Sequence, residues 1–363
     1  MHSKYTDLRG KIKEATEWNL SRVKLVSYLI VSMLKTQSVS FVKLSQGMDT
    51  RASVESNYRR IQRFFSEFDI DFKLISLLLY RLLPNKKPLR LSLDRSNWKF
   101  GKLNINILML SVCYKGVALP LLWNMLPKRG NSNYQERKDL MDRYLELFGS
   151  GSIDCLLADR EFIGESWFNY LTEKQITFYI RIRNNMDVYL GGNKKIKAGK
   201  LFYYKKYNEV HSLEEQVLIT SCKLYVWGIK HKNMDEVKTE HIIIVSNCSD
   251  GNGIEIYKDR WQIETLFKAL KSSGFNLEDT HLTNIERINK LIAITAIAFL
   301  WAYITGIFIH ENVKQIKIKR FKKSKLRKQY SFFKYGLIHL ANCLLSSFKS
   351  KELKQYYKLL SCN

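Results

Sequence analysis

The chain has 363 residues and a formal net charge of +26 at pH 7, with 45% hydrophobic and 13% aromatic residues. This apolar content excludes an intrinsically disordered protein and is sufficient for a substantial core in two or three domains. The positive charge indicates a polyanionic partner, with nucleic acid ahead of an anionic membrane surface. The 6 cysteines form no CxxC pair, which excludes a disulfide framework and a zinc site and is typical of a reduced cytoplasmic protein.

The first 85 residues are predicted to be helical. Apolar residues at helical spacing place the helices at 20–34, 39–44, 53–65 and 74–83. A glycine turn precedes the third helix, which carries Arg59, Arg60 and Arg63, and a short helix, a turn and a basic helix can read DNA. An ordinary helical bundle with surface arginines explains the pattern equally well. The sequence PNKKP at 84–88 then marks a domain boundary.

Strands dominate after this boundary. The apolar runs predict strands at 89–93, 104–114, 117–125, 153–158 and 177–182, and helices at 134–148 and 164–174. This succession indicates a mixed α/β core. Residues 184–240 are predicted to be a β-rich insertion with strands at 200–204, 216–220 and 223–229, after which the core resumes with a strand at 241–246.

Residues 254–273 are predicted to form one helix of about five turns that ends at Gly274. At about 100° per residue, Tyr257, Arg260, Glu264 and Lys271 share one face of this helix. Such a face suits a site in which Glu264 holds a cation while the two basic residues hold phosphate oxygens. A solvated helix face with a Glu–Arg pair four residues apart is the plainer alternative.

Two further acids, Asp94 and Asp159, each close a predicted apolar strand. If the two strands are neighbours and the helix of Glu264 crosses them, three carboxylates converge and can hold two Mg²⁺ ions for phosphoryl transfer on nucleic acid. Each Asp can equally be a turn or helix-cap residue. Rival carboxylates are Asp154, Glu161, Asp187, Glu255 and Asp259.

Two segments near the C-terminus admit two interpretations each. The uncharged stretch 291–309 is long enough to span a bilayer, but we expect a buried central helix because no second span accompanies it. The stretch 314–328 contains no acidic residue and is predicted to bind phosphates, with Lys322, Lys323 and Arg327 as candidates. A solvated charged connector is the alternative.

The spacing Tyr257, two residues, Arg260, three residues, Glu264, six residues, Lys271 resembles the Y-R-E-K signature of the insertion-sequence-four family of bacterial transposases. The blocks LSLDRSNWKFG around Asp94 and LLADREFIG around Asp159 also resemble this family, as does the basic-aromatic stretch 328–337. The resemblance covers residues 90–340.

The resemblance implies an RNase H-like α/β core with a mixed sheet. The core would comprise residues 89–183 and 241–312, interrupted by the β-rich insertion 184–240. An all-helical DNA-binding domain at 1–85 would precede the core, and a basic helical region at 313–363 would follow it.

The resemblance also implies residue roles. Asp94, Asp159 and Glu264 would be the catalytic triad that holds two Mg²⁺ ions, for which Mn²⁺ would substitute. Tyr257, Arg260 and Lys271 would contact the DNA backbone near the transposon end. Trp227 is the candidate in the insertion for stacking on a flipped base, although packing in the core of the insertion is at least as plausible for it.

The implied function is cut-and-paste DNA transposition by a DDE transposase. The enzyme would bind terminal inverted repeats in double-stranded DNA, cleave at the ends and join them to target DNA. It would act as a homodimer on paired ends, in the bacterial cytoplasm with the nucleoid and without a membrane. Two alternatives remain: a structure-selective nuclease on the same core, and a catalytically inactive DNA-binding protein.

Overall fold

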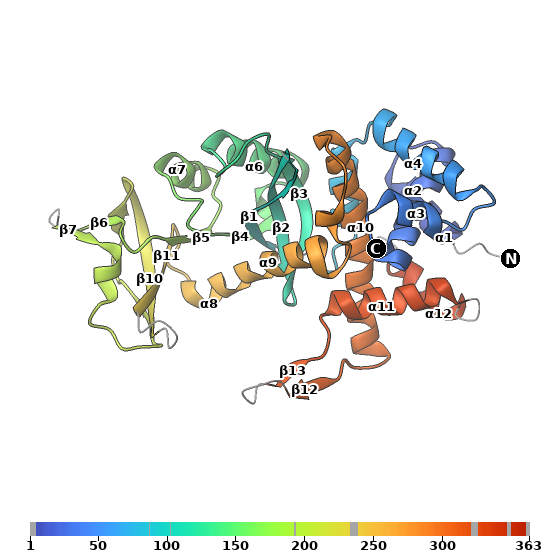
Figure 1. The fold of residues 1–363 in the computed structure, drawn as a ribbon. Coiled ribbons are helices and arrows are strands. Elements are labelled where there is room, and N and C mark those ends of the chain that lie inside the picture. The colour runs from blue at the N-terminus through green and yellow to red at the C-terminus, as the bar shows by residue number, and fades with distance from the viewer. Residues whose placement is uncertain are drawn as a thin grey trace. The chain divides into compact units, whose positions relative to one another are not determined.

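The computed structural model describes residues 5–86, 88–101, 103–191, 194–232, 239–320, 326–346 and 350–360 (Figure 1). The chain divides into two compact units. Unit 1 comprises Met1–Asn85, Trp98–Ile105 and Phe267–Asn363, and unit 2 comprises Lys86–Asn97 and Asn106–Leu266. Each unit is therefore assembled from segments that are distant in the sequence.

The main sheet has the strand order β3-β2-β1-β4-β5-β11-β10-β9-β6-β7, with β8 paired to β10. The strands of its first part are β1 (Leu89–Phe100), β2 (Leu103–Tyr114), β3 (Val117–Met125), β4 (Ile153–Ala158), β5 (Phe178–Ile182) and β11 (Thr239–Ser246). Strand β4 is parallel to both β1 and β5, whereas β11 is antiparallel to β5. The predicted mixed α/β class is confirmed, and this order is compatible with an RNase H-like transposase core.

Helices α6 (Tyr134–Phe148) and α7 (Glu165–Glu173) of unit 2 lie between these strands in the sequence: α6 precedes β4, and α7 follows it. A capping box starts α6: the Asn133 side chain accepts from the backbone of Glu136, and the Glu136 side chain accepts from the backbone of Asn133. Strand β1 is longer than predicted, because it continues through polar residues into a turn with β2 at Gly101, where φ is +55°.

The insertion is β-rich, but it contains strands that were not predicted (β6, β7 and β8) and lacks one that was. Its strands are β6 (Asp187–Leu190), β7 (Lys194–Lys197), β8 (Val210–Ser212), β9 (Val217–Ile219) and β10 (Cys222–Lys232). The strand predicted at 200–204 is wrong, because this part of the chain forms the 3₁₀ helix η3 (Ala198–Phe202). Phe202 is buried there, and its ring occupies the place where a Cβ atom at Gly228 would lie.

The helix predicted at 254–273 is a broken helical run instead of one α-helix. It consists of α8 (Gly253–Tyr257), a 3₁₀ turn (Lys258–Arg260), α9 (Trp261–Lys268) and a π turn (Ala269–Ser273). The run does end at Gly274, but φ there is −134°, so a left-handed cap is not the reason. A Cβ atom at Gly274 would lie 2.4 Å from the carbonyl oxygen of Ala269, so glycine is required by close packing.

Unit 1 is mainly helical. Its helices are α1 (Thr6–Ala15), α2 (Leu20–Thr36), α3 (Phe41–Gly47), α4 (Val54–Glu67), α5 (Phe72–Arg81), α10 (Ile285–Asn312), α11 (Phe332–Leu345) and α12 (Ser350–Lys358). Helix α10 is long and apolar enough to cross a membrane, but 89% of its most apolar window is buried inside the protein, as expected of a central core helix. The strands β12 (Ile318–Arg320) and β13 (Leu326–Lys328) form a separate two-stranded ribbon (Figure 1).

Helices α10 and α11 cross in very close contact. A Cβ atom at Gly306 would lie 1.8 Å from the carbonyl oxygen of Phe332, and one at Gly336 would lie 1.8 Å from that of Ala302. Two glycines that face each other therefore let the two backbones approach, which keeps α10 in the centre of unit 1.

Candidate active site

Asp94 and Asp159 lie beside each other in unit 2. Leu93 on β1 is the register partner of Ala158, the last residue of the parallel strand β4, so Asp94 lies beside Asp159. Asp159 directly follows its strand as predicted, whereas the prediction that Asp94 closes its strand is wrong, because β1 continues to Phe100. Each carboxylate accepts a hydrogen bond of 2.7 Å from the backbone N–H of the arginine that follows it. The juxtaposition of two predicted site residues thus follows from strand register.

Arg260 links Asp94 to Glu264. Its Nη1 lies 3.4 Å from Oδ2 of Asp94, and its Nη2 lies 2.5 Å from Oε1 of Glu264, while its side chain is only 6% exposed. Tyr257 reaches the second aspartate, since its hydroxyl donates to Oδ1 of Asp159 at 3.4 Å. The three acids are therefore connected through two side chains of the helical run.

Burial raises the pKa of Asp94 to about 6, although the backbone N–H of Arg95 and the charge of Arg260 oppose the rise. The neighbouring Asp159 adds to it, as two carboxylates at one place do. Burial also raises the pKa of Tyr257, which is therefore a neutral hydrogen-bond donor at pH 7. Burial disfavours the charge on Arg260, but Tyr257 and the carboxylates outweigh it and raise its pKa.

The donor set fits a divalent cation by its chemistry. Carboxylate oxygens are the preferred ligands of Mg²⁺, and strand register brings the carboxylates of Asp94 and Asp159 close together. Within the described residues no three acids, histidines or cysteines form a ready metal-binding group. In the structure the guanidinium of Arg260 is the counter-ion of Asp94 and Glu264.

The rival carboxylates are engaged elsewhere. Asp154 and Asp259 both pair with Arg90, at 3.4 Å and 2.5 Å. Asp187 pairs with two lysines of the insertion, and Glu255 pairs with Lys258.

Glu161 pairs with Arg95 at 3.1 Å and accepts from the backbone N–H and the hydroxyl of Ser132. This half-buried network holds the chain that follows Asp94 against the turn that follows Asp159. Sequence reasoning missed it, although an arginine directly follows each aspartate in both quoted blocks.

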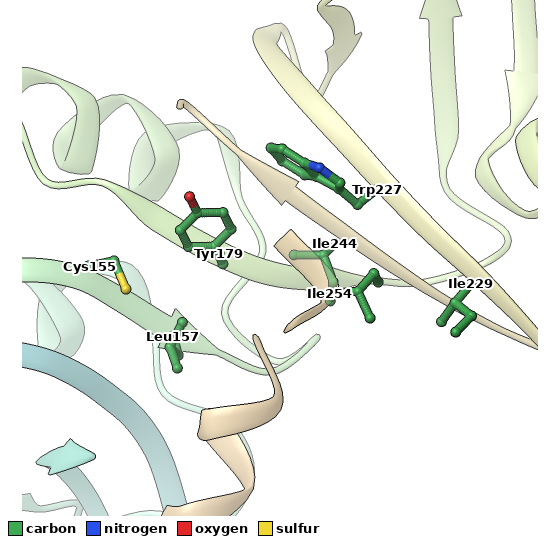
Figure 2. Close-up of a cluster of buried hydrophobic side chains, with 7 residues drawn as sticks. All are labelled: Cys155, Leu157, Tyr179, Trp227, Ile229, Ile244 and Ile254. Atoms are coloured by element: carbon green, nitrogen blue, oxygen red, sulfur yellow. The ribbon is translucent and has the colours of Figure 1, made fainter. Parts of the chain in front are cut away.

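Trp227 is buried, with 5% exposure. It belongs to a hydrophobic cluster with Cys155, Leu157, Tyr179, Ile229, Ile244 and Ile254 (Figure 2). A Cβ atom at Gly253 would lie 2.7 Å from its indole, so the start of α8 is packed directly on the ring. The structure thus gives Trp227 the packing role, and stacking on a base remains a prediction that requires the ring to leave this cluster.

Trp261 was missed by sequence reasoning. It is 65% exposed, and the guanidinium of Arg260 lies 5.6 Å from its ring centroid. Helical periodicity could have found it, because at about 100° per residue position 261 falls opposite the apolar side that contains Ile263 and Leu266. An exposed indole beside the acids is a surface on which a nucleic-acid base can stack.

Lys271, the last residue of the signature, belongs to unit 1. It lies on the π turn, where its ammonium pairs with Glu278 at 2.9 Å and lies 5.6 Å from the ring centroid of Trp98. A π turn inside a helix often accompanies a functional residue, which is consistent with the predicted DNA contact.

The three arginines of α4 differ in their surroundings. Arg59 pairs with Glu55 at 2.6 Å on the exposed helix face. Arg60 and Arg63 instead line a cavity of about 270 Å³ together with Arg22 and Glu67. Within the described part of the chain, neither Arg60 nor Arg63 has an ion-pair partner, so the cavity carries excess positive charge.

The predicted basic residues of the C-terminal region are only partly described. Lys322 and Lys323 lie outside the described residues, whereas Arg327 is exposed on β13 opposite Lys319.

A comparison with known protein families identifies the family of this chain. Residues 87–301 match the family described as Transposase DDE domain, a match that covers more than half of the chain and contains all three candidate acids. No curated protein matches the sequence. The chain therefore belongs to the transposase family defined by the DDE domain.

Proposed function

We propose that this DDE transposase is a cut-and-paste enzyme of the insertion-sequence-four family, with Asp94, Asp159 and Glu264 as its catalytic triad. One observation carries the assignment: Arg260 and Tyr257, at their signature positions, contact all three acids. The pairing of Asp154, Asp259 and Glu161 with Arg90 and Arg95 supports this choice among the acids of unit 2.

The triad would hold two Mg²⁺ ions, or Mn²⁺ in their place, which supply an activated nucleophile and stabilise the leaving oxygen when bound. Asp94, with a pKa of about 6, is mostly ionised at pH 7 and so available as a ligand. Arg260 pairs with Glu264 and Asp94 and so holds the two carboxylates close to each other. With cations bound to the acids, its guanidinium would be available for a phosphate oxygen of the DNA, the role that the signature predicts.

DNA binding would be distributed over several basic surfaces. The helical N-terminal region would bind terminal inverted repeats through Arg60 and Arg63, and the C-terminal region would contact phosphates through Arg327 and its neighbouring lysines. Two active sites are needed to process two ends, so the enzyme would work as a homodimer on paired DNA. The proposed location is the bacterial cytoplasm, at the nucleoid.

An excision assay tests the proposal. A supercoiled plasmid carries the element with the terminal repeats found in the DNA that flanks the gene, and the wild type is expected to release the element in Mg²⁺. Asp94→Asn, Asp159→Asn and Glu264→Gln should abolish release while binding of the ends persists. Asp187→Asn is the control, because its carboxylate pairs with Lys195 and Lys197 in the insertion, and it should excise normally.

Two results contradict the proposal. Normal excision by any of the three triad variants removes that residue from the catalytic centre. Cleavage by the wild type without preference for the terminal repeats, and without joining to target DNA, identifies a nuclease.

A further inference from the structure

The insertion presents an exposed aromatic segment directly after η3. All residues from 203 to 209 are exposed, and Tyr204 reaches 95% exposure, Tyr203 60% and Tyr207 44%. We call these three residues the tyrosine platform. Phenol rings exposed to this degree contribute little to the fold, so their positions indicate an interaction surface.

The backbone of the platform is anchored at both ends. At its start, the buried Phe202 ring packs onto Gly228 of β10. At its end, Tyr207 forms a β-bridge with Lys230, and the backbone N–H of Asn208 donates to the carbonyl of Lys230 at 2.8 Å. The rings are therefore displayed from a fixed backbone, which lowers the entropic cost of binding.

Lys230 contacts two residues of the platform, Tyr203 and Tyr207. Its ammonium donates to the backbone carbonyl of Tyr203 at 2.8 Å. The same ammonium lies 4.2 Å from the ring centroid of Tyr207 and 5.5 Å from that of Tyr203. The rings of Tyr203 and Tyr204 meet edge to face, with centroids 5.0 Å apart.

The surroundings of the platform are basic. Lys200, Lys205 and Lys206 are exposed beside it, and Glu209 is the one acid in the stretch 200–209. Glu209 lies 3.9 Å from Lys206 and so offsets one of these three positive charges. Exposed rings among lysines are suited to a polyanion that also carries flat apolar faces.

We infer that the tyrosine platform binds a nucleic-acid strand with unpaired bases, which stack on Tyr203 and Tyr204 while the lysines hold the phosphates. A paired base has both faces covered by its neighbours in the duplex, whereas an unpaired base can stack on a ring. Stacking requires the ring and not the hydroxyl. The inference takes its ligand class from the proposed function but does not depend on the catalytic acids.

A binding experiment on the full chain tests this inference. Fluorescence anisotropy measures affinity for a labelled single-stranded oligonucleotide and for the same sequence as a duplex, with EDTA present to prevent cleavage. Stacking contributes about 1–3 kcal/mol per base, so Tyr203→Ala/Tyr204→Ala should weaken single-strand binding by roughly tenfold or more. Tyr203→Phe/Tyr204→Phe should bind like the wild type, and duplex affinity should change little in either variant.

The control is Tyr189→Ala on β6, a 38% exposed tyrosine of the same insertion outside the platform, which should bind the single strand normally. Unchanged thermal denaturation is expected for the platform variants because the rings are exposed. The inference is overturned if the double alanine variant binds the single strand like the wild type, if the phenylalanine variant loses as much, or if duplex binding falls equally.

Failure of the proposed function gives a different result. Glu264→Gln should keep full single-strand affinity in this assay although it lacks excision. If triad variants excise normally while Tyr203→Ala/Tyr204→Ala still loses single-strand binding, the catalytic assignment is wrong and the inference about the tyrosine platform is supported.

Discussion

Replacement of Asp94 by asparagine should stabilise the protein at neutral pH. The pKa of this carboxyl rises from 3.8 to about 6 in the folded state because the group is buried beside Asp159. A rise of about 2 units at 1.36 kcal/mol per unit means that ionised Asp94 costs the fold roughly 3 kcal/mol. Asparagine has a similar shape and carries no charge, so it avoids this cost.

The sign of the pH dependence follows from proton binding. The folded protein holds the proton of Asp94 more tightly than the unfolded chain, so the wild type loses stability as the pH rises from about 4 to about 6. Above that pH range the wild type has lost all of this contribution to its stability. Asp94→Asn lacks this dependence, so its advantage should be about 3 kcal/mol at pH 7.5 and only about 1 kcal/mol at pH 4.5.

Urea denaturation at the two pH values, followed by tryptophan fluorescence, measures the difference. The matched control is Asp187→Asn, because hydrogen bonds from Lys197 and Lys195 lower the pKa of Asp187. This control should show no gain at pH 7.5. An Asp94→Asn protein that is no more stable than the wild type at pH 7.5, or that gains equally at both pH values, refutes the reasoning.

Three further predictions concern the DNA-binding arginines, Trp227 and the crossing of α10 and α11. Arg60→Ala and Arg63→Ala should each weaken DNA binding and reduce the slope of log affinity against log salt concentration by about 1. Arg59→Ala should change both quantities little, because Glu55 offsets the charge of Arg59. Fluorescence anisotropy in a salt series measures affinity and slope. Trp227→Ala should lower the free energy of unfolding by about 3–5 kcal/mol, whereas Trp261→Ala, at an exposed ring, should be nearly neutral in urea denaturation. Gly306→Ala should destabilise the protein by several kcal/mol, because the added Cβ atom meets the carbonyl of Phe332. Gly10→Ala should stabilise the protein by about 0.5–1 kcal/mol, because Gly10 lies in α1 with open space around it. Equal thermal midpoints for the two glycine variants would contradict this last prediction.

Local sequence signals were sufficient for the regular elements. Helix α6 (Tyr134–Phe148) and strand β4 (Ile153–Ala158) have the predicted bounds, because a capping box and a short apolar run define them without distant contacts. The strand predicted at 200–204 is wrong although Phe202, Tyr203 and Tyr204 are aromatic residues, which favour strands. Burial of Phe202 against Gly228, a contact distant in sequence, decides the outcome there.

The residues of the site could be selected from the sequence, but their arrangement could not. The pairing of Leu93 with Ala158, which brings Asp94 and Asp159 together, is a matter of strand register. The role of Arg260 also required the structure, because the sequence predicted a phosphate ligand and the folded chain shows a counter-ion of two acids. The exposure of Tyr204 likewise depends on the anchors of the platform and not on its local sequence.

Mn²⁺ binding in the presence of transposon-end DNA tests the central claim most directly, because the claim is that Asp94, Asp159 and Glu264 hold the catalytic metal together. Calorimetry or the loss of the free Mn²⁺ resonance signal measures it at about pH 7.5. The wild type and Asp187→Asn should bind the ion with equal affinity, and Asp94→Asn, Asp159→Asn and Glu264→Gln should each lose most of that affinity. Wild-type affinity in all three triad variants would contradict the account.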